Sequence, residues 1–170
     1  MNLDFASVWE MISDIVPEND ALICGDEIIS WKDYDLQSSK IATALKNAGL
    51  GPNSKAGLYL NNSNEYLIGQ NAIFKIGGVP INVNYRYVAE ELIYLLDNSD
   101  SEAVFYHACY SSRIKEISGS LPNIKAWIEI ADGTKSEFED SLKFEELLDS
   151  CDPMESCLLY TSDAADELLG

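Results

Sequence analysis

Apolar and polar positions alternate in blocks along the middle of the chain, and the blocks have the lengths of strands and helices. Residues 79–83 form a short apolar, β-branched run that is typical of a buried strand. Residues 88–96 carry apolar side chains at helical spacing, with Glu90 and Glu91 near the positive end of the helix dipole. Residues 103–106 are apolar again. The pattern predicts a strand–helix–strand unit with a right-handed crossover.

Two helices and a hairpin are predicted for the first third of the chain. The first helix is amphipathic and stops at Pro17, because proline cannot continue a helix. Apolar runs at 21–24 and 28–31 surround a glycine turn and predict a β-hairpin. The second helix has Ser30 as its N-cap and Gly49 as its C-terminal cap. The apolar positions of the two helices are Phe5, Val8, Ile12, Ile15, Leu36, Ile41, Ala44 and Leu45.

The alternation continues after the second helix. A buried strand is expected at 56–60, followed by a helix that closes at Gly77. Beyond the central unit, we expect a helix at 110–118, a strand at 124–130 and a short helix near 144–148. Strands that alternate with helices predict an α/β domain, with a mostly parallel sheet flanked by helices and a short N-terminal β-hairpin.

The composition of the chain is typical of a globular domain without a membrane-spanning segment. The chain has 170 residues, enough for one domain with a real core, and 46% of them are hydrophobic. No apolar run approaches the roughly 20 residues that span a bilayer, so no transmembrane segment is expected. The N-terminus lacks the pattern of a signal peptide. The 4 cysteines lie without metal-ligand spacing, which favours reduced thiols and a cytoplasmic protein.

The charge of the chain limits the classes of partner that it is expected to bind. A net charge of -18 argues against nucleic acid and against an anionic membrane surface. Eight carboxylates lie close together between Asp132 and Asp152. Their spacing does not match a calcium loop, so a solvated acidic edge is favoured over a cation site. We therefore predict no metal site.

Few side chains suggest chemistry. The chain contains neither of the glycine-rich phosphate-binding patterns, G-x-x-x-x-G-K-S/T and G-x-G-x-x-G. The only histidine, His107, follows the strand at 103–106, where it could act as a base. No serine or cysteine nucleophile can be assigned beside it. No catalytic residue is therefore assigned.

A polar, aromatic connection at residues 84–87, which we call the elbow, follows the strand at 79–83. Arg86 lies just past the strand end, where open α/β sheets often bind ligands. A structural ion pair with Glu90 or Glu91 is the favoured interpretation of this arginine. The nearby tyrosines are expected to pack, and not to form a stacking platform for a ligand: Tyr85, Tyr87 and Tyr94.

Four short sequence segments, which we call phrases, occur in an order that is typical of one enzyme family. They lie at residues 29–34, 46–52, 76–86 and 91–99. In combination they resemble the N-terminal part of adenylate-forming (AMP-binding) acyl-CoA synthetases. The third phrase is the most specific and is similar to fatty-acyl-CoA synthetases in particular. The resemblance covers about residues 3 to 155.

The resemblance implies a partial N-terminal domain of the adenylate-forming fold, expected at residues 1–156, from a two-step ligase. In such an enzyme a carboxylate attacks the α-phosphate of ATP, giving an acyl-adenylate and pyrophosphate. The thiol of coenzyme A (CoA) then displaces AMP. The first step needs Mg²⁺ and a glycine-rich loop, because negative charge must be neutralised where pyrophosphate leaves. The small-molecule substrate implied for the parent enzyme is a fatty or similarly apolar carboxylate.

The chain departs from the family pattern at the phosphate loop. Tyr160, Thr161 and Ser162 match the start of that loop and are the only candidate cofactor-binding residues. Acidic residues then replace its glycines, and carboxylates repel phosphate. Residues 157–170 also resemble translated sequencing-adapter read-through, which predicts a non-native tail; a natural divergent loop is the alternative. We predict that this chain binds no ATP, CoA or Mg²⁺ and is catalytically inactive.

Two alternatives remain open at this stage. A non-catalytic α/β binding or interaction module could use the same half-domain. A different member of the family, such as an acid-activating peptide-synthetase domain or a luciferase-like oxidase, would share the same scaffold. For the leading interpretation, the resemblance implies that this segment packs against later strands and helices, so the isolated chain is expected to expose apolar faces. The sequence leaves its oligomeric state undetermined.

Overall fold

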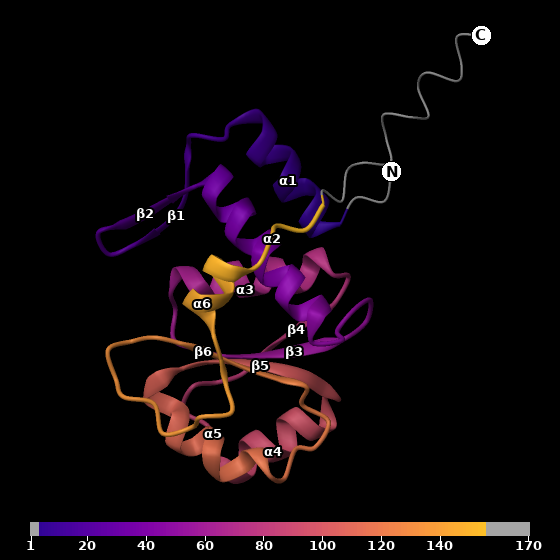
Figure 1. Cartoon of the computed structure of the whole chain (residues 1–170), viewed down its shortest axis with the longest axis vertical. Helices are drawn as coiled ribbons and strands as arrows, with labels where there is room; N and C mark the ends of the chain where they lie inside the picture. Colours follow the sequence, from indigo (N-terminus) through magenta and orange to yellow (C-terminus); the bar gives the residue numbers. More distant parts are fainter. Residues whose placement is uncertain (1–3, 156–170) are drawn as a thin grey trace, which may run out of the picture.

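A five-stranded parallel sheet divides the protein into three layers (Figure 1). The computed structural model describes residues 4–155. Every pairing within this sheet is parallel, and the strand order is β4-β3-β5-β6-β7. The predicted α/β class with a mostly parallel sheet is therefore confirmed. The strands are β3 (Lys55–Tyr59), β4 (Val79–Asn82), β5 (Ser101–His107), β6 (Ala126–Ile130) and β7 (Leu142–Lys143).

Helices cover both faces of the sheet (Figure 1). Four of them, α1 (Phe5–Ile15), α2 (Trp31–Asn47), α3 (Asn64–Lys75) and α6 (Phe144–Ser150), lie on one side. The other side carries α4 (Ala89–Asn98) and α5 (Ser111–Ser118). A short 3-10 helix, η1 (Ala108–Tyr110), lies directly before α5 in the chain. The predicted hairpin is also present: β1 (Asp20–Cys24) and β2 (Glu27–Ser30) form a separate antiparallel pair.

Both faces of the central strand are buried, as they must be when helices cover a sheet on two sides. Ala103 and Phe105 of β5 point into the core beneath α2 and α3. Val104 and Tyr106, which alternate with them, point into the second core against α4 and α5. The near-continuous apolar run at 103–106 is thus the sequence signature of a doubly covered strand.

Several predicted helix ends are confirmed. The Ser30 hydroxyl accepts a hydrogen bond from the Asp33 N–H and caps α2. Gly49 and Gly77, which follow α2 and α3, adopt positive φ angles of 84° and 71°. Gly78 is needed for a different reason: an added Cβ would lie 2.9 Å from the carbonyl oxygen of Ser54.

The structure also corrects the sequence-based elements. The strand predicted at 124–130 begins at Ala126, because Ile124 closes a turn by donating its N–H to the carbonyl of Leu121. Leu36 was assigned to the apolar side of α2, but it is 40% exposed. The two-residue strand β7 was not predicted, since two residues are too few to show a period of two.

The first helix leaves two of its predicted apolar side chains largely exposed, although Trp9 of the same helix packs against the core. Phe5 and Ile15 are 63% and 73% exposed, whereas Glu10 on the opposite side is buried. The sequence predicted this helix and its apolar positions, but not which side faces the core. No helix in residues 4–155 is long and apolar enough to cross a membrane.

Candidate functional site

The sheet contains a point where the strand order reverses. From β3 the chain crosses to β4 on one side, and β5 then lies on the other side of β3. In open α/β sheets, ligands bind outside the carboxyl ends of the strands at such a point. Polar residues follow each of these ends: Asn61 after β3, Asn84 after β4, and His107 at the last position of β5.

A hollow of about 520 Å³ lies at this edge, past the ends of β3 and β4. None of the residues that line it carries a formal charge, so it offers amide groups, phenol groups and aromatic faces to a ligand. The sequence indicated ligand binding near here only through Arg86. The side chains that line the hollow include Asn62, Tyr66, Asn82, Asn84, Tyr85 and Tyr87.

Arg113 of α5 holds the elbow that forms one wall of this hollow. Its Nη1 atom donates to the hydroxyl of Tyr59 at 2.5 Å and to the carbonyl oxygen of Tyr87 at 2.7 Å. The Tyr59 hydroxyl in turn lies 3.2 Å from the carbonyl oxygen of Tyr85. Tyr59 is fully buried, and burial raises the pKa of its phenol although Arg113 lowers it. The pair therefore fixes the backbone of the elbow from inside the core.

Arg86 does not form the predicted ion pair. No ion pair in residues 4–155 involves this side chain. Its guanidinium lies 5.4 Å from the centre of the Tyr85 ring, a cation–π geometry. The carboxylate of Glu91 instead accepts the N–H of Val88 at 2.9 Å and so caps α4. The packing role predicted for Tyr94 is also wrong, because this side chain is 71% exposed.

His107 joins the ends of two strands through a hydrogen bond, and no nucleophile partners it within residues 4–155. Its Nδ1 atom accepts the N–H of Asn61 at 3.2 Å, so a neutral ring carries its proton on Nε2. The side chain is only 6% exposed. Burial lowers the pKa of His107, against the opposing effect of Asp132 and Glu65. The geometry supports a structural role for this histidine.

The neighbouring cysteine is also unsuited to nucleophilic catalysis. Burial and the adjacent Asp132 raise the pKa of the Cys109 thiol to about 11, so it stays protonated at neutral pH. The Asp132 carboxylate accepts the N–H groups of Cys109 and Thr134, each at 2.9 Å. Against the effect of burial, these bonds lower the pKa of Asp132. Asp132 therefore orders the loop after β6.

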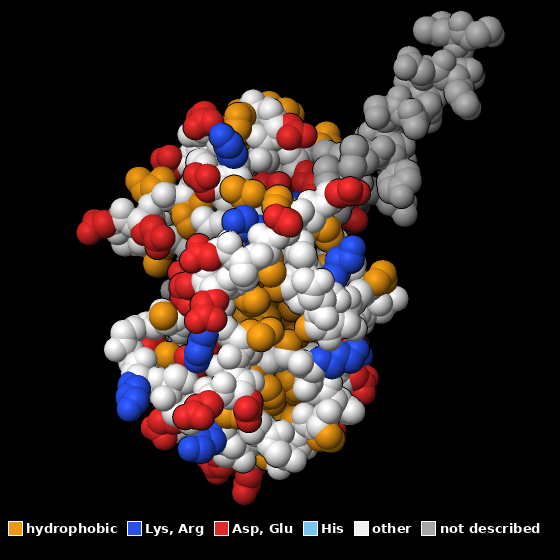
Figure 2. All heavy atoms as spheres, in the orientation of Figure 1, with side chains coloured by type: hydrophobic (Ala, Val, Ile, Leu, Met, Phe, Trp, Pro, Cys, Tyr) orange, Lys and Arg blue, Asp and Glu red, His pale blue; other side chains and the backbone are white. Residues whose placement is uncertain are grey.

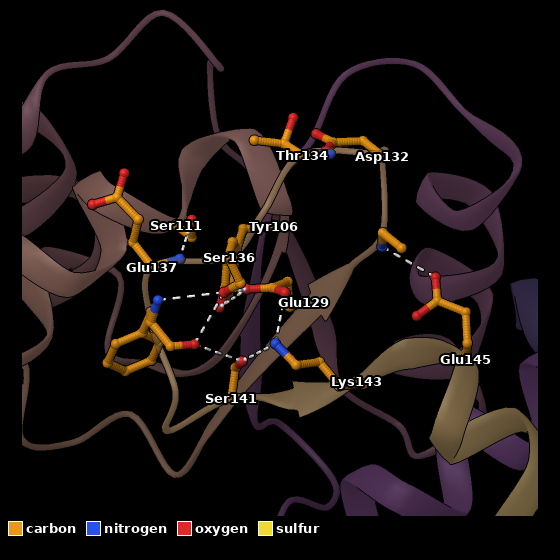
Figure 3. Close-up of polar contacts among 12 residues, drawn as sticks. Tyr106, Ser111, Glu129, Asp132, Thr134, Ser136, Glu137, Ser141, Lys143 and Glu145 are labelled. Atoms are coloured by element: carbon orange, nitrogen blue, oxygen red, sulfur yellow. Dashed lines mark hydrogen bonds and ion pairs between the residues drawn. The ribbon is translucent and has the colours of Figure 1, made fainter.

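A second carboxylate anchors the other end of this loop (Figure 3). Glu129 of β6 accepts hydrogen bonds from the Tyr106 hydroxyl at 2.9 Å and from the Lys143 ammonium at 2.6 Å. Although burial opposes it, the Lys143 contact lowers the pKa of Glu129. Ser136 adds a third donor. The network joins β5, β6 and β7. Its side chains hydrogen-bond to one another, which supports a structural role for them.

The eight carboxylates between Asp132 and Asp152 all belong to exposed residues, as expected for a solvated acidic edge. No group of three or more His, Cys, Asp or Glu residues in positions 4–155 is arranged to hold a metal ion. Figure 2 shows acidic side chains spread over much of the visible face. Cys24, Cys109 and Cys151 are free thiols. Tyr160, Thr161 and Ser162 lie outside the described residues, so their role at a phosphate loop stays a prediction.

Comparison with known proteins identifies the family. The AMP-binding enzyme family matches residues 13–163, which is most of the chain. This protein belongs to the AMP-binding enzyme family. The match extends over the Tyr160–Ser162 segment. The resemblance inferred from the four phrases in the sequence is thereby confirmed at the level of the family.

The curated relatives of this AMP-binding protein include acyl-CoA ligases. A medium/long-chain-fatty-acid–CoA/3-oxocholest-4-en-26-oate–CoA ligase of Mycobacterium marinum is 37% identical over 136 residues, covering 80% of this chain and 25% of the relative. A 3-oxocholest-4-en-26-oate–CoA ligase of Rhodococcus rhodochrous is 35% identical, covering 81% of this chain and 25% of the relative. The chain thus spans about a quarter of the length of these relatives.

Solved structures show the same fold. The acetoacetyl-CoA synthetase of Streptomyces lividans superposes with a TM-score of 0.81 at 20% identity, covering 91% of this chain and 26% of that one. At this level of identity the likeness establishes the fold alone. Together with the parallel sheet, it confirms the predicted scaffold of an adenylate-forming enzyme.

Proposed function

We propose that this chain is the N-terminal α/β part of an ATP-dependent ligase that joins an apolar carboxylic acid to coenzyme A. The observation that carries the proposal is the family match over residues 13–163, combined with relatives named as acyl-CoA ligases at 37% and 35% identity. One relative is named for medium- and long-chain fatty acids and for 3-oxocholest-4-en-26-oate, and the other for 3-oxocholest-4-en-26-oate. A fatty or similarly apolar acid is therefore the substrate class we propose.

In the proposed reaction, the acid attacks the α-phosphate of ATP and the resulting acyl-adenylate is transferred to the thiol of CoA. Mg²⁺ would neutralise the charge that develops on pyrophosphate as it leaves. The contribution proposed for residues 4–155 is the scaffold: the sheet positions the loops at its carboxyl edge, and Arg113 with Tyr59 fixes one of those loops. The proposed location is the cytoplasm, where ATP and CoA are available.

The hollow at the sheet edge is poorly suited to a polyphosphate, which supports the proposal that this chain does not act alone. Arg113 is already used by Tyr59 and a backbone carbonyl, and the lining of the hollow at the sheet edge carries no positive charge. Tyr160–Ser162 are followed by Asp163, Asp166 and Glu167. A phosphate loop needs close approach of its backbone to the phosphate, and carboxylates repel phosphate. We therefore propose that the 170-residue chain is inactive by itself.

A pyrophosphate-release assay tests this inactivity. The purified chain is mixed with ATP, Mg²⁺ and a panel of carboxylic acids from acetate to long-chain fatty acids. We expect no release above the rate without protein, and no saturable binding of ATP by calorimetry. Turnover or tight ATP binding would contradict the proposal.

A chimera tests the proposed ligase role separately. Residues 4–155 replace the matching segment of the Mycobacterium marinum ligase, which is 37% identical over the aligned region. If this scaffold is equivalent, the chimera forms fatty-acyl-CoA from a medium- or long-chain acid. A matched chimera that also carries Arg113→Ala should be slower, because its elbow is no longer held. A folded, soluble chimera that shows no adenylation would contradict the proposed role.

The boundary between residues 156 and 157 remains a proposal, together with the non-native character of residues 157–170. Reading the genomic locus past codon 156 tests it directly. A glycine-rich loop in place of Asp163–Glu167 would support a replaced tail. The same tail in genomic DNA, followed by a stop codon, would favour the alternative of a non-catalytic binding or interaction module.

A further inference from the structure

Two buried polar side chains of the helical layer have no hydrogen-bond partner among residues 4–155. They belong to Ser38 of α2 and Asn71 of α3, and both residues are 0% exposed. The Ser38 hydroxyl is unpaired, and so are the amide oxygen and the amide nitrogen of Asn71. Nearly all buried polar side chains of folded proteins have a partner, either in the protein or in ordered water. These three atoms therefore require an explanation.

The contacts between α2 and α3, which lie in the same layer (Figure 1), bring the two residues to one level of that layer. The hydroxyl of Tyr34, one turn before Ser38, donates to the carbonyl oxygen of Leu67 at 3.1 Å. Leu67 in turn lies one turn before Asn71. Further along, the C-terminal turns of both helices line one hollow. Positions four residues apart share a helix face, so Ser38 and Asn71 belong to the boundary between the two helices.

The polar groups nearest in this layer are already paired. The Nζ atom of Lys75 lies 2.5 Å from Glu10 and 2.8 Å from Asp35. The remaining buried side chains of α2 and α3 belong to one hydrophobic core, and those within one turn of Ser38 or Asn71 include Ile41, Ala42, Ile68 and Ala72. A hydroxyl and an amide without a partner in such surroundings would lower the stability of the fold.

Water is the ligand whose chemistry matches these atoms. The Asn71 amide offers an acceptor oxygen and a donor nitrogen, and the Ser38 hydroxyl can donate or accept. Water donates and accepts at once, and a buried water in a protein typically makes about three hydrogen bonds. A direct bond between the two side chains would pair only one of the two amide atoms. A larger ligand could not reach groups that are 0% exposed without separating the helices.

We propose that the boundary between α2 and α3 is an internal hydration site, in which buried water hydrogen-bonds to the Ser38 hydroxyl and to the Asn71 amide and so links the two helices. The site lies in the described part of the chain and does not depend on the proposed ligase activity. It can therefore be tested on the 170-residue chain with water itself as the ligand.

Nuclear magnetic resonance can detect this water directly. We expect a nuclear Overhauser effect between the side-chain amide protons of Asn71 and water, with the sign that marks a long-lived contact. Asn98 at the end of α4 is exposed and is the matched control. Its amide should show only the sign of rapidly exchanging surface water. An Asn71 amide without the effect, or with the same sign as Asn98, would overturn the proposal.

Oxygen-17 relaxation dispersion counts long-lived waters and is not affected by the exchange of hydroxyl protons. The variant Asn71→Leu replaces the amide by an apolar side chain of similar size, and it should lower the count by about one water. The matched control is Ser39→Ala, which removes a hydroxyl from the neighbouring buried position and should leave the count unchanged. Equal counts in the parent and in folded Asn71→Leu would contradict the site.

A double variant keeps the test valid if Asn71→Leu does not fold. Ser38→Ala/Asn71→Leu removes all three unpaired atoms together, and replacing both polar partners by apolar groups costs little stability. We expect its thermal midpoint to stay within about 4 °C of the parent, while its count of long-lived waters falls as in the single variant. A folded double variant that retains every long-lived water would show that the boundary is dry, and the proposal would fail.

Discussion

The Nζ atom of Lys75 lies 2.5 Å from Oε1 of Glu10 and joins α3 to α1 through the interior of the protein. The lysine side chain is 1% exposed, and Asp35 of α2 lies on its other side at 2.8 Å. Burial lowers the pKa of Lys75, but its hydrogen bonds to Asp35 and Glu10 outweigh this effect and raise it. The ammonium therefore remains charged and holds three helices in one arrangement.

Removing the ammonium should destabilise the protein strongly. Lys75→Met leaves the buried Glu10 carboxylate and the partly exposed Asp35 carboxylate without their cation, at a cost of about 3 kcal/mol in the free energy of unfolding. Urea denaturation followed by circular dichroism measures this loss. The double variant Lys75→Met/Glu10→Leu should recover part of it, because an apolar pair can replace a buried ion pair. A single variant within about 0.5 kcal/mol of the parent would contradict this account.

Tyr59→Phe tests how the elbow at residues 84–87 is held. The substitution removes the hydroxyl that accepts from Arg113 and lies against the carbonyl of Tyr85. Since one of these bonds involves a charged group, we expect a loss of about 2 kcal/mol in unfolding free energy. Hydrogen exchange should also become faster at the Tyr87 amide, which closes the elbow by donating to the carbonyl of Asn84.

The matched control for this prediction is Tyr94→Phe. Its side chain is 71% exposed, so removal of the hydroxyl should leave both the stability and the exchange unchanged. Unchanged exchange at the Tyr87 amide in Tyr59→Phe would show that the elbow is held by other contacts.

The buried histidine should make stability depend on pH. Burial lowers the pKa of His107 in the folded state, while the unfolded chain has a value near 6.5. As the pH falls below about 6.5, the unfolded state therefore binds the proton first and the folded state loses stability. Chemical denaturation at pH 7.5 and pH 5.5 should show this loss in the parent. A smaller loss is expected in His107→Gln, and identical losses in the two proteins would rule out the histidine as the cause.

Two glycines with different surroundings provide a paired test of packing. In Gly78→Ala the new Cβ would lie 2.9 Å from the Ser54 carbonyl oxygen, a backbone atom that cannot move away easily. We expect a loss of about 1–3 kcal/mol in unfolding free energy. In Gly119→Ala nothing lies within 4 Å of the added Cβ, and the stability should be unchanged or slightly higher. Equal effects of the two substitutions would refute the packing argument.

The hollow at the sheet edge could be anticipated only in part. An arginine just past a strand end pointed to the correct edge of the sheet, because strand ends of a parallel sheet meet on one side. The wall of the hollow, however, depends on Arg113 and Tyr59, which are 54 residues apart in sequence. No local pattern encodes a hydrogen bond between positions so far apart. The ion pair expected for Arg86 was wrong for a local reason, because the Glu91 carboxylate accepts the N–H of Val88 and caps α4.

Sequence by itself determined the order and type of most elements of this AMP-binding protein, together with the caps at Ser30, Gly49 and Gly77. These features follow from interactions within a few residues, which a linear pattern records. Only the tertiary structure decided which side of α1 faces the core. The apolar stripe favours burial, but a buried ammonium on another helix requires Glu10, and that competition exists only once the helices have packed.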